Sequence, residues 1–456
     1  MSSAASEHAA DELGYEKISK LVLKFSIPAI IGMFVNTIYN IVDRIYVSYG
    51  IDPLGIAGIS VVMPVMTALI ASSILIGVGA NALFSIRLGQ KRRRQVEKIM
   101  GHAFVLLFAV PAVMIIISLI FIDEFLLDVL KVSPAIFSYA KAYLRVILIG
   151  GIFGAVGPGI NHFIRSDGHP KMSMFTQILG AVINIVLDPI FIFVFDWGIE
   201  GAAWATVISQ FISFVWVMIY FNSKQTKLRF RFRFMKLDPK LCLQIAALGF
   251  APFIMQIAMG IVNAFLNRSL LIYGGDIAVT SMGIVFSLLM IFIMPLIGLN
   301  QGIQPIIGYN YGAGAIDRVK KAYMTGVIYS TIVIIFCFAL IQIFPHTFIL
   351  IFHGKADELA FMSQKALRIC TLMFPFLGFQ IITSNFFQAI GKPIQGTILS
   401  MSRQLLFFIP ILLILPRFLG LDGVFYTFPI SDALSMALSF VIIRRQFREF
   451  SLVVSG

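Results

Sequence analysis

Long apolar segments constrain the fold of this chain more than any other feature. Runs of about 20 apolar residues, each long enough to cross a hydrocarbon core of roughly 30 Å, recur from Leu21 to the C-terminal end. Hydrophobic residues fill 59% of the 456 positions and charged residues 12%, whereas a soluble domain carries roughly 25% charged residues. The sequence therefore predicts a polytopic helical membrane protein and excludes a water-soluble globule.

The charges between the apolar runs predict the topology. The runs form twelve expected spans of ordinary helical length. The loops alternate in charge, and the basic ones include RLGQKRRRQVEK, RSDGHPK, KQTKLRFRFRFMK and DRVKK. Lys and Arg mark the cytoplasmic side of a membrane, so we expect both termini in the cytoplasm. The net charge of +13 is then a topology signal, and we expect no nucleic-acid partner.

The two halves of the chain resemble each other at an offset of about 222 to 224 residues. The matched pairs are IVDRIYVSYG with AFLNRSLLIYG, RLGQKRRRQVEK with NYGAGAIDRVKK, SDGHP with AIGKP, and WGIEGAAW with LGLDGVFY. Each half has six spans and therefore the same orientation, as in transporters with parallel repeats. We expect an all-α membrane protein with two pseudo-twofold-related six-helix lobes around a central cavity. The lobes would comprise residues 1–223 and 241–456, joined by a basic cytoplasmic linker at 224–240.

The stretch NIVLDPIF, residues 184–191, places polar groups inside the fifth span. Asp188 lies eight residues before Asp196, or about 12 Å below the outer boundary at 1.5 Å per residue. Asn184 lies one helical turn deeper on the same face. Pro189 removes a backbone hydrogen bond and should kink the helix.

The first and sixth spans supply polar groups at a similar depth. Asp43 lies seven residues inside Gly50, and Asn36, Asn40 and Asp43 form one polar stripe. Thr206 of the sixth span should reach the same level. Such a set of oxygens suits Na⁺ or a shared proton, because intramembrane acids usually mark ion or proton pathways. In the alternative, Asp43 snorkels to the headgroups and Asp188 only locks the kink.

The C-terminal half carries a second set of intramembrane polar residues. Arg403 and Asp432 should both lie near the bilayer midplane, where we favour a structural ion pair over a substrate or proton site. Gln256 is a further polar residue of the seventh span.

With these residues identified, the chain resembles bacterial members of the multidrug and toxic compound extrusion (MATE) family. The resemblance covers nearly the whole length and rests on VNTIYNIVDRIYVSYG, the NxxxDP motif at Asn184, IRSDGHPKMS, and the late SRQ and FPISD stretches. It implies antiport, in which amphiphilic, often cationic compounds are exported in exchange for H⁺ or Na⁺ by alternating access. It also implies a cation site at Asp43, Asn184, Asp188 and Thr206, with Tyr143 as a further member. Family members that depend on a C-lobe acid in the seventh helix differ from this chain, which has Gln256 and Asn267 there.

These observations define the expected function and its rivals. We expect a monomeric multidrug efflux antiporter of the bacterial inner membrane that contacts lipid and drug-like molecules, confers antibiotic resistance and needs no cofactor besides the coupling ion. The main alternative is a lipid-linked saccharide flippase of the same superfamily, which should line its cavity with several Arg or Lys. A channel is disfavoured because no repeated filter loop is present. An enzyme is disfavoured because GxSxG, HExxH and clustered catalytic His/Asp sets are absent from the sequence.

Overall fold

The computed structural model is helical throughout the part of the chain that it describes, residues 12–223, 226, 228–354 and 357–455. The predicted all-α class is confirmed. Residues 1–11 and 456, which include the two termini assigned to the cytoplasm, lie outside the described residues. So do Lys224, Gln225 and Lys227 of the predicted linker.

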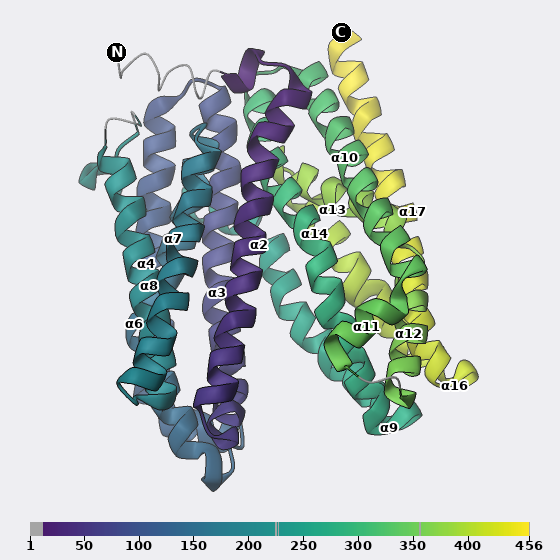
Figure 1. Cartoon of the computed structure of the whole chain (residues 1–456). Helices are drawn as coiled ribbons and strands as arrows, with labels where there is room; N and C mark the ends of the chain where they lie inside the picture. The colour runs from purple at the N-terminus through teal and green to yellow at the C-terminus, as the bar shows by residue number, and fades with distance from the viewer. Residues whose placement is uncertain (1–11, 224–225, 227, 355–356, 456) are drawn as a thin grey trace. The chain divides into compact units, whose positions relative to one another are not determined.

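The N-terminal helices form the first of two compact units (Figure 1). They are α2 (Ile18–Gly50), α3 (Pro53–Gly89), α4 (Arg93–Ile120), α5 (Ile122–Glu124), α6 (Pro134–Ser166), α7 (Pro170–Pro189) and α8 (Gly198–Asn222), with π-helical turns η1 (Phe125–Val129) and η2 (Ile190–Val194). Within this unit α6 packs against α3, α4, α7 and α8. The helix α6 is therefore central to the unit and contacts α7, which carries the NxxxDP motif.

The second unit contains the C-terminal helices. They are α9 (Pro239–Gly312), α10 (Ile316–Ile343), α11 (Pro345–His353), α12 (Glu358–Cys370), α13 (Phe374–Ala389), α14 (Pro393–Met401), α15 (Ile409–Ile414), α16 (Pro416–Leu419) and α17 (Leu421–Ser455), with the π-helical segment η4 (Ser402–Phe408). A short 3₁₀ turn, η3 (Phe232–Phe234), precedes them.

The described helices account for the twelve predicted spans. Ten of the described helices are each long and apolar enough to cross a membrane. One of the ten, α9, has 74 residues and breaks at Gly275, whose φ is 66°. At 1.5 Å per residue it is about 111 Å long, so it holds two spans. The helices α12 and α13, bent by 54°, together form one further span.

The two units exchange the first turns of their first helices. The segment Lys17–Ser26, which includes the start of α2, clusters with the second unit, and the start of α9 up to Gly249 clusters with the first. In the first unit, a Cβ on Gly249 would approach the Leu75 carbonyl oxygen to 1.7 Å. In the second, a Cβ on Gly302 would approach Ser26 Oγ to 2.5 Å. In each unit, the exchanged segment packs against its neighbour at a position where only glycine leaves enough space. The same arrangement in both units is expected of an internal repeat.

Candidate functional site

The NxxxDP motif lies where α7 changes its helical geometry. Pro170 begins α7 at a position where its missing N–H costs nothing. Pro189 ends the helix, and the chain continues as η2, in which the Phe195 N–H donates to the Ile190 carbonyl five residues earlier. Because Pro189 has no N–H to donate to the carbonyl of residue 185, the α-helical ladder is interrupted at this point. Single π-helical turns of this kind are frequent at functional sites.

Asn184 and Asp188 are buried on one face of α7. Asp188 is 0% exposed and Asn184 is 1% exposed. The Asn184 Nδ2 donates to Asp188 Oδ1 over 3.3 Å. Two oxygens of this pair, Asn184 Oδ1 and Asp188 Oδ2, have no hydrogen-bond partner. Two unpartnered oxygens one helical turn apart can accept hydrogen bonds or coordinate a small cation.

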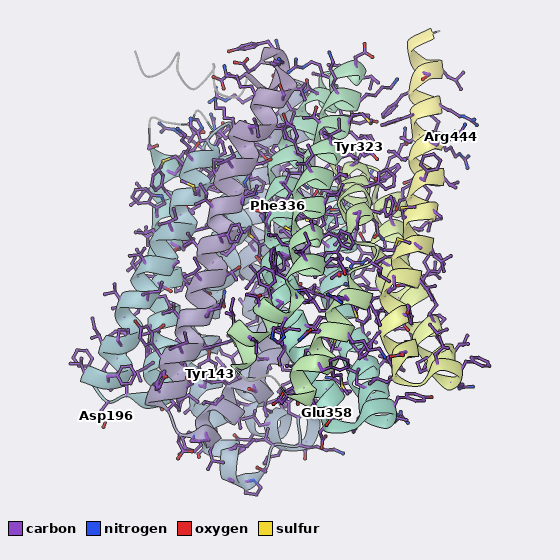
Figure 2. The ribbon with its side chains drawn as sticks, turned by 45° about the vertical axis from the view of Figure 1, so that its right-hand side comes forward. Tyr143, Asp196, Tyr323, Phe336, Glu358 and Arg444 are labelled. Carbon is purple, nitrogen blue, oxygen red and sulfur yellow. The ribbon has the colours of Figure 1, made fainter. Side chains whose placement is uncertain are left out.

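Asp43 of α2 interacts directly with Asp188. The two acids lie close enough to interact electrostatically with each other. Two tyrosines, Tyr39 and Tyr143, lie close enough to interact electrostatically with both carboxyls. Tyr143 is buried on α6 and lies toward the same end of the unit as Asp196 (Figure 2). The structure therefore brings Asp43, Asp188, Asn184 and Tyr143 together from α2, α6 and α7.

The acid pair lacks a compensating positive partner in the described structure. Among the described residues, neither Asp43 nor Asp188 forms an ion pair. Arg44 adds an electrostatic attraction to Asp43, but its side chain is exposed. No group of three His, Cys, Asp or Glu residues converges anywhere in the described part of the chain. Two adjacent carboxyls, an amide oxygen and neighbouring phenols suit a proton or a hard monovalent cation better than a transition metal.

Three predicted members of the site have their own local contacts. Thr206, half-buried on α8, accepts a bond from Ser209 Oγ at its carbonyl (2.8 Å), and its hydroxyl forms no hydrogen bond with either acid among the described residues. The Asn40 Nδ2 donates to Asn36 O at 2.7 Å and to Asn36 Oδ1 at 2.9 Å. Asn36 and Asn40 are exposed, whereas Asp43 is half-buried. The stripe predicted on the first span therefore divides into exposed amides and a half-buried acid.

Sequence reasoning missed Tyr39. This residue lies four positions before Asp43 on α2, so both side chains project from the same face. The i, i+4 spacing could have identified it, but tyrosine in an apolar span is usually a packing residue.

The predicted polar residues of the second unit form a different arrangement. Arg403 lies within η4 and Asp432 on α17, and Arg403 Nε donates to Asp432 Oδ1 over 2.7 Å. Asp432 is 6% exposed. Gln256 of α9 is half-buried. The charged residues here balance each other in an ion pair.

Comparisons with known proteins agree over nearly the whole chain. The model of the MatE family matches residues 28–190 and 248–414. The multidrug export protein MepA of Staphylococcus saprophyticus is 28% identical over 433 residues, which cover 94% of each chain. A multidrug resistance MATE family transporter of the MOP superfamily, solved in an outward-facing conformation, superimposes with a TM-score of 0.91 at 26% identity, covering 97% of this chain and 98% of that one. A MOP superfamily transporter from Pyrococcus furiosus, for which a reverse polarity of the binding pocket suggests a different function, gives a TM-score of 0.88 at 26% identity and covers 95% and 97%.

Proposed function

The chain belongs to the MatE family of membrane transporters, and we propose that it is a multidrug efflux antiporter driven by a cation bound at Asp43 and Asp188. It is a multi-pass membrane protein and a transporter rather than an enzyme. Its substrates would be amphiphilic, often cationic drug-like compounds, in keeping with the multidrug export protein to which it is similar.

One observation carries the proposed coupling role, namely the proximity of the half-buried Asp43 to the fully buried Asp188. Two adjacent carboxylates cannot both stay ionised in a poorly hydrated place without a compensating charge. Among the described residues neither is offset by an ion pair, and Asp188 Oδ2 and Asn184 Oδ1 have no partner. A proton or a Na⁺ ion would supply both the missing charge and the missing contact. The pair would titrate as a unit.

The junction at Pro189 offers a way to link cation binding to movement. Asp188 is the last residue before this proline, and η2 packs against α2, since a Cβ on Gly50 would approach Ile192 Cγ2 to 2.3 Å. A cation that draws the Asp43 and Asp188 side chains together would therefore act on the angle between α2 and the end of α7. In this mechanism a cation enters from outside, changes the bend at Pro189 and releases the drug outward. Departure of the cation on the inner side then resets the cycle.

The topology belongs to the same proposal. The basic loops and both termini face the cytoplasm of a bacterial cell, and residues 1–223 and 241–456 act as the two lobes of a monomer. The N-terminal lobe holds the cation site. No cofactor takes part besides the coupling ion, H⁺ or Na⁺.

Everted membrane vesicles provide the test. The rate of ethidium accumulation is measured with a pH gradient and with a Na⁺ gradient imposed separately. Accumulation driven by only one gradient identifies the coupling ion, and its loss in Asp188→Asn places coupling at the pair. Absence of accumulation under both gradients contradicts the antiport proposal.

A lipid-linked saccharide flippase remains the rival function. It needs several cationic side chains free to hold a pyrophosphate group. Arg403 is engaged by Asp432 at 2.7 Å, which weakens this rival. Transport of a fluorescent lipid-linked saccharide by vesicles that fail to accumulate ethidium would favour it.

A further inference from the structure

A polar stripe continues along α7 from the acid pair toward the opposite end of the helix. Its members follow one another at spacings of three or four residues and so share one face; they are Ser173, Gln177, Gly180, Asn184 and Asp188. Ser173 is 0% exposed. From Ser173 to Asp188 the helix rises through 15 residue steps, or about 22 Å at 1.5 Å per residue. The stripe therefore extends across most of the hydrocarbon thickness.

Near the middle of this stripe, two polar side chains of α8 pack against glycines. Ser213 packs against Gly180 of α7, and Gln210 packs against Gly154 of α6. A Cβ on Gly180 would approach Ser213 Oγ to 2.5 Å. A Cβ on Gly154 would approach Gln210 Oε1 to 2.3 Å. Since α6, α7 and α8 pack against one another, these oxygens lie among the three helices. At both positions the polar side chain fills the space that the Cβ of any residue other than glycine would need.

The far end of the stripe is closed by buried polar residues of α6. Arg165 Nη2 donates to Ser173 Oγ over 3.3 Å, and Asn161 Nδ2 donates to Ser173 O over 3.1 Å. Arg165 is only 3% exposed and Asn161 only 6%. Arg165 Nε and Asn161 Oδ1 nevertheless have no hydrogen-bond partner. No acid pairs with Arg165 in the described part of the chain.

Buried polar atoms rarely stay unpaired, because they lose their bonds to water on burial. Here such atoms occur at both ends of one stripe, at Asn184 and Asp188 and again at Asn161 and Arg165. Water molecules would satisfy both ends. Between the ends, Ser213 and Gln210 provide a hydroxyl and an amide that can bond to a passing water or cation. The Gln177 amide lies at the side of α2, where a Cβ on Gly32 would approach its Oε1 to 2.9 Å.

We propose that these residues form a hydrated column inside the N-terminal lobe through which the coupling cation passes between the acid pair and the cytoplasm. The column comprises Asp188, Asn184, Gly180, Gln177 and Ser173 of α7, with Gly154, Asn161 and Arg165 of α6 and Gln210 and Ser213 of α8. Arg165 places a fixed positive charge at its inner end, which repels cations and limits their leak. The inference rests on the proposed function for the identity of the ion and the orientation. The cation would thus have a route that the drug does not use.

Accessibility of introduced thiols to Ag⁺, a small cation, tests this column. The background variant carries Cys242→Ala, Cys337→Ala and Cys370→Ala, since these three are the free cysteines. Everted vesicles expose the cytoplasmic face, and a nitrate buffer keeps Ag⁺ soluble. Ser173→Cys and Ser213→Cys are compared with controls on the exposed face of α7, Val182→Cys and Val186→Cys, at which valine is 51% and 52% exposed. The readout is the fraction of thiol blocked before labelling with a fluorescent maleimide under denaturing conditions.

We expect Ag⁺ to block the two column thiols at least about tenfold faster than the two controls, with Ser173→Cys faster than Ser213→Cys. Adding Arg165→Gln should speed the reaction at Ser213→Cys by about tenfold, as expected for removal of a nearby unit charge, and Arg165→Lys should not. Equal Ag⁺ reaction rates at the column and control positions would contradict the proposed column. This comparison does not depend on whether Arg165→Gln inserts into the membrane. Ethidium accumulation by the parent vesicles is measured separately. A failure of the antiport proposal can therefore be distinguished from a failure of the column proposal.

Discussion

The two halves of this chain share a scaffold but use intramembrane charge differently. In the N-terminal unit, Asp43 and Asp188 place two acids side by side without an ion-pair partner among the described residues. In the C-terminal unit, Arg403 and Asp432 form a 2.7 Å ion pair. The repeat partner of Asp43 is Asn267, which is exposed and uncharged. The difference suggests that an intramembrane charged group serves ion exchange when it is unbalanced and structure when it is balanced.

Both charge sites lie at π-helical segments. Asp188 precedes η2, and Arg403 lies inside η4. A π-helical turn frees backbone groups and turns side chains off the α-helical stripe. At the repeat offset of about 222 to 224 residues, η2 corresponds to residues 412–418 and not to η4, so each half has its own place where side-chain direction can change.

The largest effect is expected from Asp188→Asn. The substitution keeps the shape of the side chain but removes the charge that would bind the cation, so ethidium efflux should fall at least about 100-fold, in the range for a coupling loss of a few kcal/mol. The matched control is Asp196→Asn, because Asp196 is an exposed acid with a φ of 55° that asparagine tolerates. Both variants should insert at parental levels. Equal drug resistance in cells carrying either variant would remove the coupling role.

Breaking the ion pair should instead affect stability. Arg403→Gln or Asp432→Asn leaves one charged partner alone, at a cost of about 3 kcal/mol, the lower end for buried pairs because Arg403 is 23% exposed. The double variant Arg403→Met with Asp432→Leu should recover most of the lost thermal stability and retain efflux. A double variant that is stable yet inactive would show that the C-terminal pair also serves transport. This result would contradict the contrast between a functional N-terminal pair and a structural C-terminal pair.

A smaller effect is expected from Asn184→Ala. The bond from Asn184 to Asp188 is 3.3 Å long, and its loss also removes an unpartnered oxygen from the site. Removing one such contact costs about 1 to 1.5 kcal/mol, so the apparent affinity for the coupling ion should weaken by about tenfold while the maximal rate is kept. The half-saturating ion concentration of ethidium transport measures this. A Thr206→Val variant is the comparison, and it should have less effect because the Thr206 hydroxyl forms no hydrogen bond with either acid in the described structure.

The smallest effect concerns a buried acid outside the spans. Burial raises the pKa of Asp167 from 3.8 to about 7, against smaller opposing contributions from Thr226, Tyr220 and Arg93. The Tyr220 hydroxyl donates to Asp167 Oδ2 over 2.9 Å, and His169 Nδ1 lies 3.9 Å from the same oxygen. Because the folded state holds this proton more tightly than the unfolded state, stability should fall as pH rises from about 4 to about 7 and then level off.

Asp167→Asn should remove this slope from the pH dependence of the melting temperature of the purified protein. Asp238→Asn serves as control, since Asp238 is half-buried and its pKa is lowered mainly by the Lys98 hydrogen bond. An unchanged slope in Asp167→Asn would show that the group titrates normally.

Much of the fold followed from the sequence because hydrocarbon leaves few choices for a backbone. Apolar runs and charged loops predicted twelve spans, although α9 joins two of them across Gly275 without a loop. The NxxxDP motif identified the bend because proline has a fixed local effect. Depth estimates predicted that Asp43 and Asp188 lie at one level, and in the structure the two acids are close enough to interact electrostatically.

Other parts of the site depend on rotation about helix axes, which depth does not determine. Thr206 lies on the helix predicted to reach the acids, yet its hydroxyl forms no hydrogen bond with either of them among the described residues. Asn40 bonds to Asn36 on the exposed side of α2. The turn of η2 after Pro189 also changes side-chain direction in a way that an α-helical projection cannot represent.

The most direct test measures cation release when drug binds. Ethidium is added to purified detergent-solubilised protein in weakly buffered solution, and released protons are followed with an indicator dye while released ²²Na⁺ is followed in parallel. We expect the parent protein to release one of these cations in proportion to bound ethidium, and Asp188→Asn to bind ethidium without releasing either. Equal release by the parent and by Asp188→Asn would contradict the assignment of the coupling site to Asp43 and Asp188.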